Sequence, residues 1–261
     1  MSEPSDLSDA DRARYAWQLS VKDFGESGQR RLKGATVFVS RCGGVGGTVA
    51  LQLAAAGVGR LILAHAGNLR PDDLNRQLLM SHAGLGQSRV RQAADRLRAF
   101  NPLIDVVPFE ENVTEENVDR LVSDADVIAS CAPLFSERLL LNRAAFARKK
   151  PLVDCAMYEM EAQLTTILPG NGPCLACLYP TEPVAWKRQF PVFGAVAGAV
   201  ACLGAMEVIK VLAGLGEPLV GKMLICDLAA MSFRKVALRR DDRCSVCGPS
   251  ANVAAAGTPG E

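Results

Sequence analysis

The chain has 261 residues, 49% of them hydrophobic, so it can form one large or two small domains with a substantial core. Its 29 lysine and arginine residues nearly balance its 28 aspartate and glutamate residues, and no long run of like charge occurs. These features argue against a nucleic-acid-binding arm and against a polybasic membrane patch. We therefore expect neither nucleic acid nor a membrane as a partner.

The N-terminal residues 1–14 are polar and acidic and lack the apolar core of a secretory signal peptide. We therefore expect a cytoplasmic protein. The most apolar stretch, residues 190–206, is about as long as the shortest membrane span. It is rich in glycine and alanine, however, and continues into Glu207 and Lys210, which favours a buried helix.

Strand-like and helix-like patterns alternate along the first 157 residues. The expected strands are 35–40, 60–65, 105–110, 125–131 and 151–157, and the expected helices are about 46–56, 87–100 and 136–148. This alternation predicts an α/β fold with a Rossmann-like, doubly wound and mostly parallel sheet. After Met157 the pattern changes to a strand at 161–170, a cysteine-bearing loop, the apolar helix and a hairpin at 221–240. We expect these segments to continue the sheet in antiparallel fashion.

Residues 39–59 read "VSRCGGVGGTVALQLAAAGVG", an apolar strand that leads through a glycine cluster into a helix of small residues. Backbone N–H groups in such a turn can hold a phosphate at the helix N-terminus. Gly43, Gly44 and Gly46 suit that role, but Arg41 occupies the place of the first glycine. A dinucleotide-dependent oxidoreductase fits poorly, because no acidic residue stands near His65 to bind a ribose.

Four of the nine cysteines form two C-x-x-C pairs, Cys174 with Cys177 and Cys244 with Cys247. Two such pairs can place four thiolates around Zn²⁺ at about 2.3 Å, in a closed site that has no open catalytic position. We therefore predict a structural zinc ion. Redox-active dithiols and unrelated free thiols remain as alternatives. Of the other five cysteines we expect buried thiols, except for Cys42, which stands in the glycine turn; the others are Cys131, Cys155, Cys202 and Cys226.

Several motifs occur together with these cysteine pairs in one chain order. They are "RYAWQL" at 14–19, "FGESGQRRLKGATVFV" at 24–39 and "DLNRQLL" at 73–79. Together they resemble the family of ubiquitin-activating-like enzymes typified by MoeB, ThiF and HesA. The segments "AMYEMEAQLTTILPG" and "PCLACLYP" are most similar to the HesA group.

The resemblance implies a single domain over residues 12–248. Within it we expect a nucleotide-binding-type half at about 34–157 and a zinc-containing half at 158–248, with flexible tails at 1–11 and 249–261. It also implies a homodimer that uses Mg-ATP to adenylate the C-terminal carboxylate of a small ubiquitin-like or sulfur-carrier protein. A heterodimer with an active paralogue is the alternative assembly.

The chain departs from the family pattern at positions that hold ATP and Mg²⁺. Arg41 replaces a glycine, His65 replaces the ribose-binding aspartate, Trp17 replaces a phosphate-contacting arginine, and Pro133 in "SCAPL" replaces the Mg²⁺-binding aspartate. Imidazole is no substitute for a two-oxygen acceptor, and proline cannot ligate Mg²⁺. Arg89 replaces a lysine and keeps its charge. The family residues that the chain retains are Gly43, Gly44, Gly46, Asn75, Arg76, Gln77 and the four paired cysteines.

Loss of one positioned charge-stabilising group typically costs about 3 to 4 kcal/mol of transition-state stabilisation. We therefore predict a catalytically degenerate member that keeps the fold and the zinc and binds a protein partner or an anionic ligand, in sulfur or metal-cofactor metabolism. The replaced residues either became packing residues or re-purposed the pocket, which gains about two to three positive charges relative to the family pattern. The competing hypothesis is an active adenylyltransferase in which Arg41, Arg70, Arg76 and Arg89 compensate.

Overall fold

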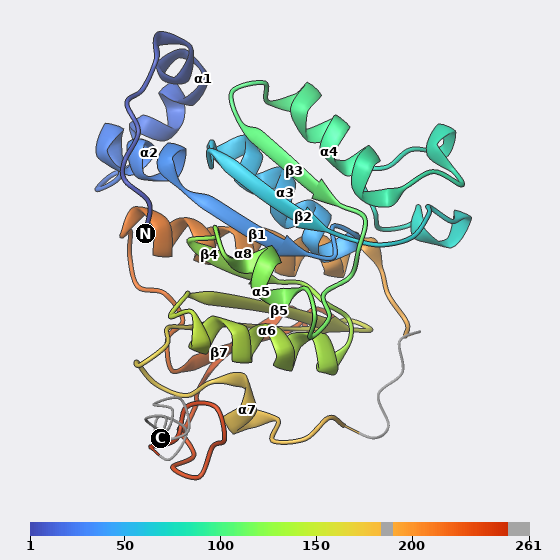
Figure 1. Cartoon of the computed structure of the whole chain (residues 1–261), viewed down its shortest axis with the longest axis vertical. Helices are drawn as coiled ribbons and strands as arrows, with labels where there is room; N and C mark the ends of the chain where they lie inside the picture. The colour runs from blue at the N-terminus through green and yellow to red at the C-terminus, as the bar shows by residue number, and fades with distance from the viewer. Residues whose placement is uncertain (184–189, 250–261) are drawn as a thin grey trace, which may run out of the picture.

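The computed structural model describes residues 1–183 and 190–249 (Figure 1). Within these ranges eight strands form one sheet in the order β3-β2-β1-β4-β5-β6-β7-β8. The strands are β1 (Thr36–Ser40), β2 (Arg60–Ala64), β3 (Asp105–Phe109), β4 (Val127–Ser130), β5 (Leu152–Tyr158), β6 (Glu161–Ile167), β7 (Lys222–Asp227) and β8 (Ser232–Ala237). The first five strands are parallel, and β6, β7 and β8 continue the sheet, each antiparallel to the strand before it, which confirms the predicted fold class.

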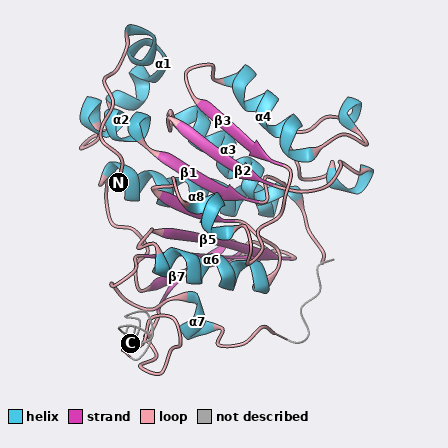
Figure 2. Cartoon of the chain, in the orientation of Figure 1, coloured by secondary structure: helices cyan, strands magenta, loops and turns pink. Residues whose placement is uncertain are grey.

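Helices cover both faces of this sheet (Figure 2). They are α1 (Asp9–Leu19), α2 (Gly25–Gly34), α3 (Gly44–Ala56), α4 (Arg89–Phe100), α5 (Val118–Val122), α6 (Phe135–Ala147), α7 (Leu175–Leu178) and α8 (Gly194–Ala213). Along β1, Val37 and Val39 pack with α3 and α8, whereas Phe38 packs with α5 and α6 on the other face. The strand is apolar throughout because both of its faces are covered.

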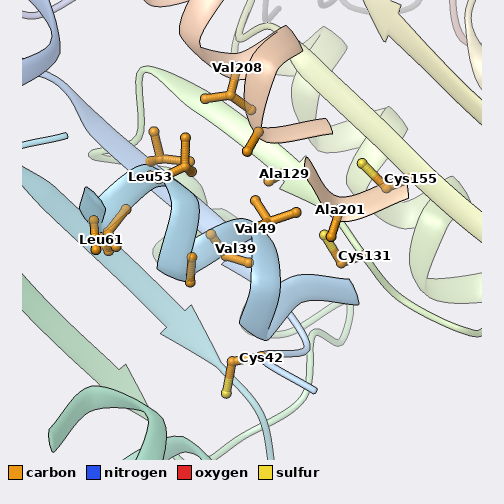
Figure 3. Close-up of a cluster of buried hydrophobic side chains, with 14 of the residues drawn as sticks. Val39, Cys42, Val49, Leu53, Leu61, Ala129, Cys131, Cys155, Ala201 and Val208 are labelled. Atoms are coloured by element: carbon orange, nitrogen blue, oxygen red, sulfur yellow. The ribbon is translucent and has the colours of Figure 1, made fainter. Parts of the chain in front are cut away.

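The core between the sheet and helices α3 and α8 is built from small and branched side chains (Figure 3). Val49 and Leu53 of α3 lie there with Ala201 and Val208 of α8. By length and composition α8 is apolar enough to cross a membrane, and half of its most apolar window is buried inside the protein. It lies against α3, β5 and β6, as we expect of a core helix.

The N-terminal segment differs from the expectation of a free tail at 1–11. Leu7 is buried, and Ser8 caps α1 by accepting a hydrogen bond from the backbone N–H of Asp11. Ser2 hydrogen-bonds through its hydroxyl to the Asp126 carboxylate at 2.7 Å. These contacts hold the first residues against the rest of the protein. The other predicted tail, 249–261, lies outside the described residues from 250 onward.

Candidate functional site

A cavity of about 160 Å³ opens at the carboxyl ends of the parallel strands, where α/β sheets commonly bind ligands. The segments that follow β1, β2 and β4 supply Arg41, His65 and Pro133 to its wall. The glycine turn contributes Gly43 and Gly44. The fold therefore gathers at one place most of the residues that the sequence analysis assigned to a nucleotide or anion site.

The glycine turn keeps a tight backbone path. A Cβ atom on Gly46 would lie 2.3 Å from the Arg41 carbonyl oxygen, so only glycine fits there. Arg41 itself has a φ of 59°, in the left-handed region that glycine adopts without penalty. A side chain in this conformation costs about 1 to 2 kcal/mol. The backbone at this position thus takes a conformation that suits glycine, although this chain carries an arginine there.

Arg41 is held by an ion pair with Glu137 from the first turn of α6. Its Nε and Nη2 atoms lie 2.7 Å and 2.6 Å from Glu137 Oε2, and both side chains are buried. Removing one partner of such a pair would leave a buried charge without compensation, which typically costs about 3 to 5 kcal/mol. The pair therefore fixes a guanidinium beside the glycine turn.

Asp73 organises the opposite wall of the cavity. It accepts hydrogen bonds from Arg89 Nη2 and Gln77 Nε2, each at 2.6 Å, and Arg76 Nη2 lies 3.4 Å away. Burial alone raises the pKa of Asp73, but the hydrogen bonds from Arg89 and from the Arg70 backbone bring that pKa below its usual value. Asp73 is therefore ionised at neutral pH.

The third charged pair lies beneath the cavity, between α6 and β5. Arg138 Nη2 lies 2.6 Å from Asp154 Oδ2, and the Ser130 hydroxyl donates to Asp154 Oδ1 at 2.9 Å. The Arg138 guanidinium also stands over the rings of Phe135 and Tyr179, at 4.5 Å and 5.5 Å from their centres. Tyr179 follows Cys177 by two residues, so this cluster connects the cavity to the cysteine pairs.

The sequence indicated Asp73 only as a possible partner of Arg76 and did not indicate Glu137 or Asp154, and these three carboxylates change the electrostatics of the site. The site is a set of ion pairs and not an open positive patch. Asp154 offered a signal, because a carboxylate within the apolar run "PLVDCAM" is seldom buried without a partner. Glu137 offered none, since its partner Arg41 is 96 residues distant in the chain.

The remaining predicted site residues fall in three places. His65 is buried with its Nδ1 atom 3.7 Å from Cys42 Sγ, and burial raises the pKa of that thiol to about 12. Asn75 is exposed and accepts a hydrogen bond from Arg76 at 2.8 Å. Trp17 is 92% exposed on α1 and is not among the residues that line the cavity.

The four paired cysteines converge as predicted. Their sulfur atoms all lie within 4.8 Å of one another, with Cys174 to Cys244 at 3.6 Å and Cys177 to Cys247 at 3.3 Å. Tetrahedral Zn–S bonds of about 2.3 Å would set the sulfur atoms about 3.8 Å apart, so this cluster fits a metal ion. Cys174 directly precedes α7, Cys177 lies within it, and the other two cysteines lie in the C-terminal loop, so such a site would tie this loop to α7.

Comparisons with known proteins show the family and the fold. The protein HesA (heterocyst) of Trichormus variabilis is 49% identical over 245 residues, covering 94% of this chain and 92% of the relative. The sulfur carrier protein adenylyltransferase of Thermus thermophilus is 37% identical over 244 residues, covering 90% of each chain. The crystal structure of E. coli MccB with MccA-N7isoASN matches with a TM-score of 0.81 at 23% identity, covering 93% of this chain and 76% of that one, and shows the same fold. Since the ThiF family also matches residues 15–246, the chain belongs to the ThiF family.

Proposed function

We propose that this chain is a catalytically degenerate member of its family whose cavity binds a small anionic ligand without Mg-ATP chemistry. The observation that carries the proposal is the buried Arg41–Glu137 ion pair beside the glycine turn. A residue that merely drifted after loss of function would not be expected in a strained conformation with a matched buried partner. The pair therefore favours a re-purposed pocket over simple loss of selection.

The acidic groups around the cavity support the absence of Mg²⁺ chemistry. In the described part of the chain, Asp73, Glu137 and Asp154 are each bonded to an arginine. Mg²⁺ is usually bound through one or two carboxylates together with phosphate oxygens and water. To supply one of these carboxylates, the protein would have to break a buried ion pair, which is costly.

Arg76 is the guanidinium best placed to meet a ligand. It lines the cavity, its side chain is 28% exposed, and its contact to Asp73 at 3.4 Å is long because Arg89 holds that carboxylate more closely. The backbone of Gly43 and Gly44 stands beside it. Ligand pockets for drug-sized molecules usually measure about 300 to 1,000 Å³, so this smaller cavity suits a phosphate-sized or carboxylate-bearing ligand.

The wider setting is part of the same proposal. We infer a cytoplasmic homodimer with a structural Zn²⁺ on Cys174, Cys177, Cys244 and Cys247, acting with a protein partner in sulfur or metal-cofactor metabolism. The cysteine geometry supports the zinc. The relationship to HesA and to a sulfur carrier protein adenylyltransferase supports the metabolic setting.

The second candidate is an active adenylyltransferase that activates the C-terminus of a ubiquitin-like sulfur carrier. The 37% identity to the Thermus thermophilus enzyme along 90% of both chains favours it. Under this alternative the arginines of the cavity neutralise the triphosphate, and an active paralogue in a heterodimer could supply missing groups.

An exchange assay separates the two candidates. Zinc-loaded protein is incubated with Mg-ATP, labelled pyrophosphate and a carrier protein that ends in Gly-Gly. We expect no label in ATP, whereas the fourfold back-substitution W17R, R41G, H65D and P133D should gain Mg-ATP binding. A matched control variant is R91A, which breaks an exposed ion pair with Glu110 and leaves all four of these positions unchanged. Exchange by the unmodified protein would contradict the proposal.

A further inference from the structure

We propose that Cys131 and Cys155 form a dithiol at the floor of the cavity that is oxidised to a disulfide by exchange with a small disulfide ligand. Both residues line the cavity. Neither belongs to the zinc cluster, and neither is used by the proposed anion site. Only the expected preference for a negatively charged disulfide rests on the proposed function, since the carboxylates of such a ligand would contact Arg76.

The strand register places the two cysteines side by side. Ser130, the last residue of β4, pairs with Asp154 of β5 in a parallel ladder; Cys131 directly follows β4, and Cys155 is the next residue of β5. Neighbouring strands lie about 4.8 Å apart, within the range of about 4.4 to 6.8 Å that separates the Cα atoms of bonded cysteines. A disulfide therefore needs little movement of the backbone.

The residues around the two cysteines provide space for the Cys155 thiol and limit access to both thiols. A Cβ atom on Gly204 of α8 would lie 2.3 Å from Cys155 Sγ, so the glycine provides the space that this thiol occupies. Figure 3 shows both cysteines at the same end of the buried cluster, beside Ala201. Their exposed fractions are 7% for Cys131 and 2% for Cys155, so a reagent must enter through the cavity.

The exposures suggest an order of steps. The more accessible Cys131 loses its proton and attacks one sulfur of the ligand, which forms a mixed disulfide and releases one ligand thiol. Cys155 then loses its proton and attacks Cys131 Sγ, which forms the Cys131–Cys155 bond and releases the second thiol. The protein loses two electrons and two protons, and the ligand disulfide gains both to become two thiols.

The pKa of Cys155 fits the second role. The neighbouring Cys131 thiol and burial hold the pKa of Cys155 well above its usual value, while the nearby Arg138 guanidinium opposes the rise. Cys155 is therefore protonated at neutral pH, and since only the thiolate attacks, closure of the bond should accelerate as pH rises.

The test uses the zinc-loaded full chain in a C202S background, which removes a thiol that is exposed on α8. The protein is treated with dithiodiglycolate or with the neutral 2-hydroxyethyl disulfide, and peptide mapping by mass spectrometry locates new bonds. We expect a Cys131–Cys155 bond with both reagents and a C155S variant that stops at the mixed disulfide on Cys131. The variant C226S, which removes a buried thiol elsewhere, should behave like the background.

Two results separate failure of the dithiol from failure of the anion site. If neither reagent produces a Cys131–Cys155 bond while the protein stays folded, the dithiol proposal is wrong. Equal rates with both reagents, together with a bond, would leave the dithiol intact and contradict anion binding by Arg76. If C155S fails to fold, peptide mapping of the protein that keeps both Cys131 and Cys155 still shows whether the disulfide forms.

Discussion

The cysteine cluster and the strand-end cavity differ in what holds them together. All four sulfur donors are present and lie close enough to hold one metal ion. The cavity instead has the glycine turn beside Arg41, His65 and Pro133, and by our proposal these three residues have replaced groups that bind ATP and Mg²⁺. A structural metal site needs each of its donor atoms at a fixed distance from the metal. A ligand pocket can instead come to bind a different ligand when a charged side chain and its ion-pair partner are replaced together.

Removal of a cysteine donor should produce the largest effect. Structural zinc contributes about 10 to 16 kcal/mol of binding free energy in small peptides, so we expect C244S to lose the metal and more than about 5 kcal/mol of unfolding free energy. Zinc release measured with a chromogenic chelator and urea unfolding check this. The control C202S should keep both values, since Cys202 is exposed on α8. Full zinc retention by C244S would contradict the claim that the metal site needs all four of its cysteine donors.

The buried pair at the glycine turn gives the next largest effect. E137A should lower the free energy of unfolding by about 3 to 5 kcal/mol because it leaves the Arg41 guanidinium buried without a partner. The double variant R41G/E137A should recover most of that loss, since it also removes the left-handed arginine. Urea unfolding of the single and double variants measures the coupling. Additive losses would show that the two residues do not act as a pair.

Asp73 should make stability depend on pH. Its folded pKa lies below the usual value, so its contribution is present above the unfolded pKa of about 3.9 and is lost as pH falls through the folded pKa. We expect D73N to lose about 1.5 to 3 kcal/mol at pH 7, because hydrogen bonds to charged groups are worth that much. The difference from the unmodified protein should shrink below about pH 4. A difference that does not change between pH 7 and pH 3 would contradict this.

Arg76 should have the smallest effect on folding and a clear one on binding. Because it is partly exposed, R76A should change stability by less than about 0.5 kcal/mol. Loss of a charge-assisted contact of about 1.5 kcal/mol should weaken phosphate binding about tenfold. Calorimetry with inorganic phosphate measures this, with R91A as the matched surface control. Unchanged phosphate affinity in R76A would remove that arginine from the site.

Most of the fold and the cysteine cluster could be predicted from the sequence, but the buried ion pairs of the cavity could not. Alternating patterns located the parallel strands, and the C-x-x-C spacing located the metal cluster, because both signals are local in the chain. The pair of Arg41 and Glu137 could not be predicted because it joins segments that are 96 residues apart in the chain. The packing of residues 1–11 was also missed, since their polar composition gave no sign of partners such as Asp126.

We propose that the cavity has exchanged Mg-ATP for a small anion. The most direct test is calorimetry of zinc-loaded protein with ATP, in the presence and absence of Mg²⁺, beside inorganic phosphate. We expect no heat that depends on Mg²⁺ and a binding signal for phosphate. Saturable ATP binding that requires Mg²⁺ would contradict it and would favour an active adenylyltransferase.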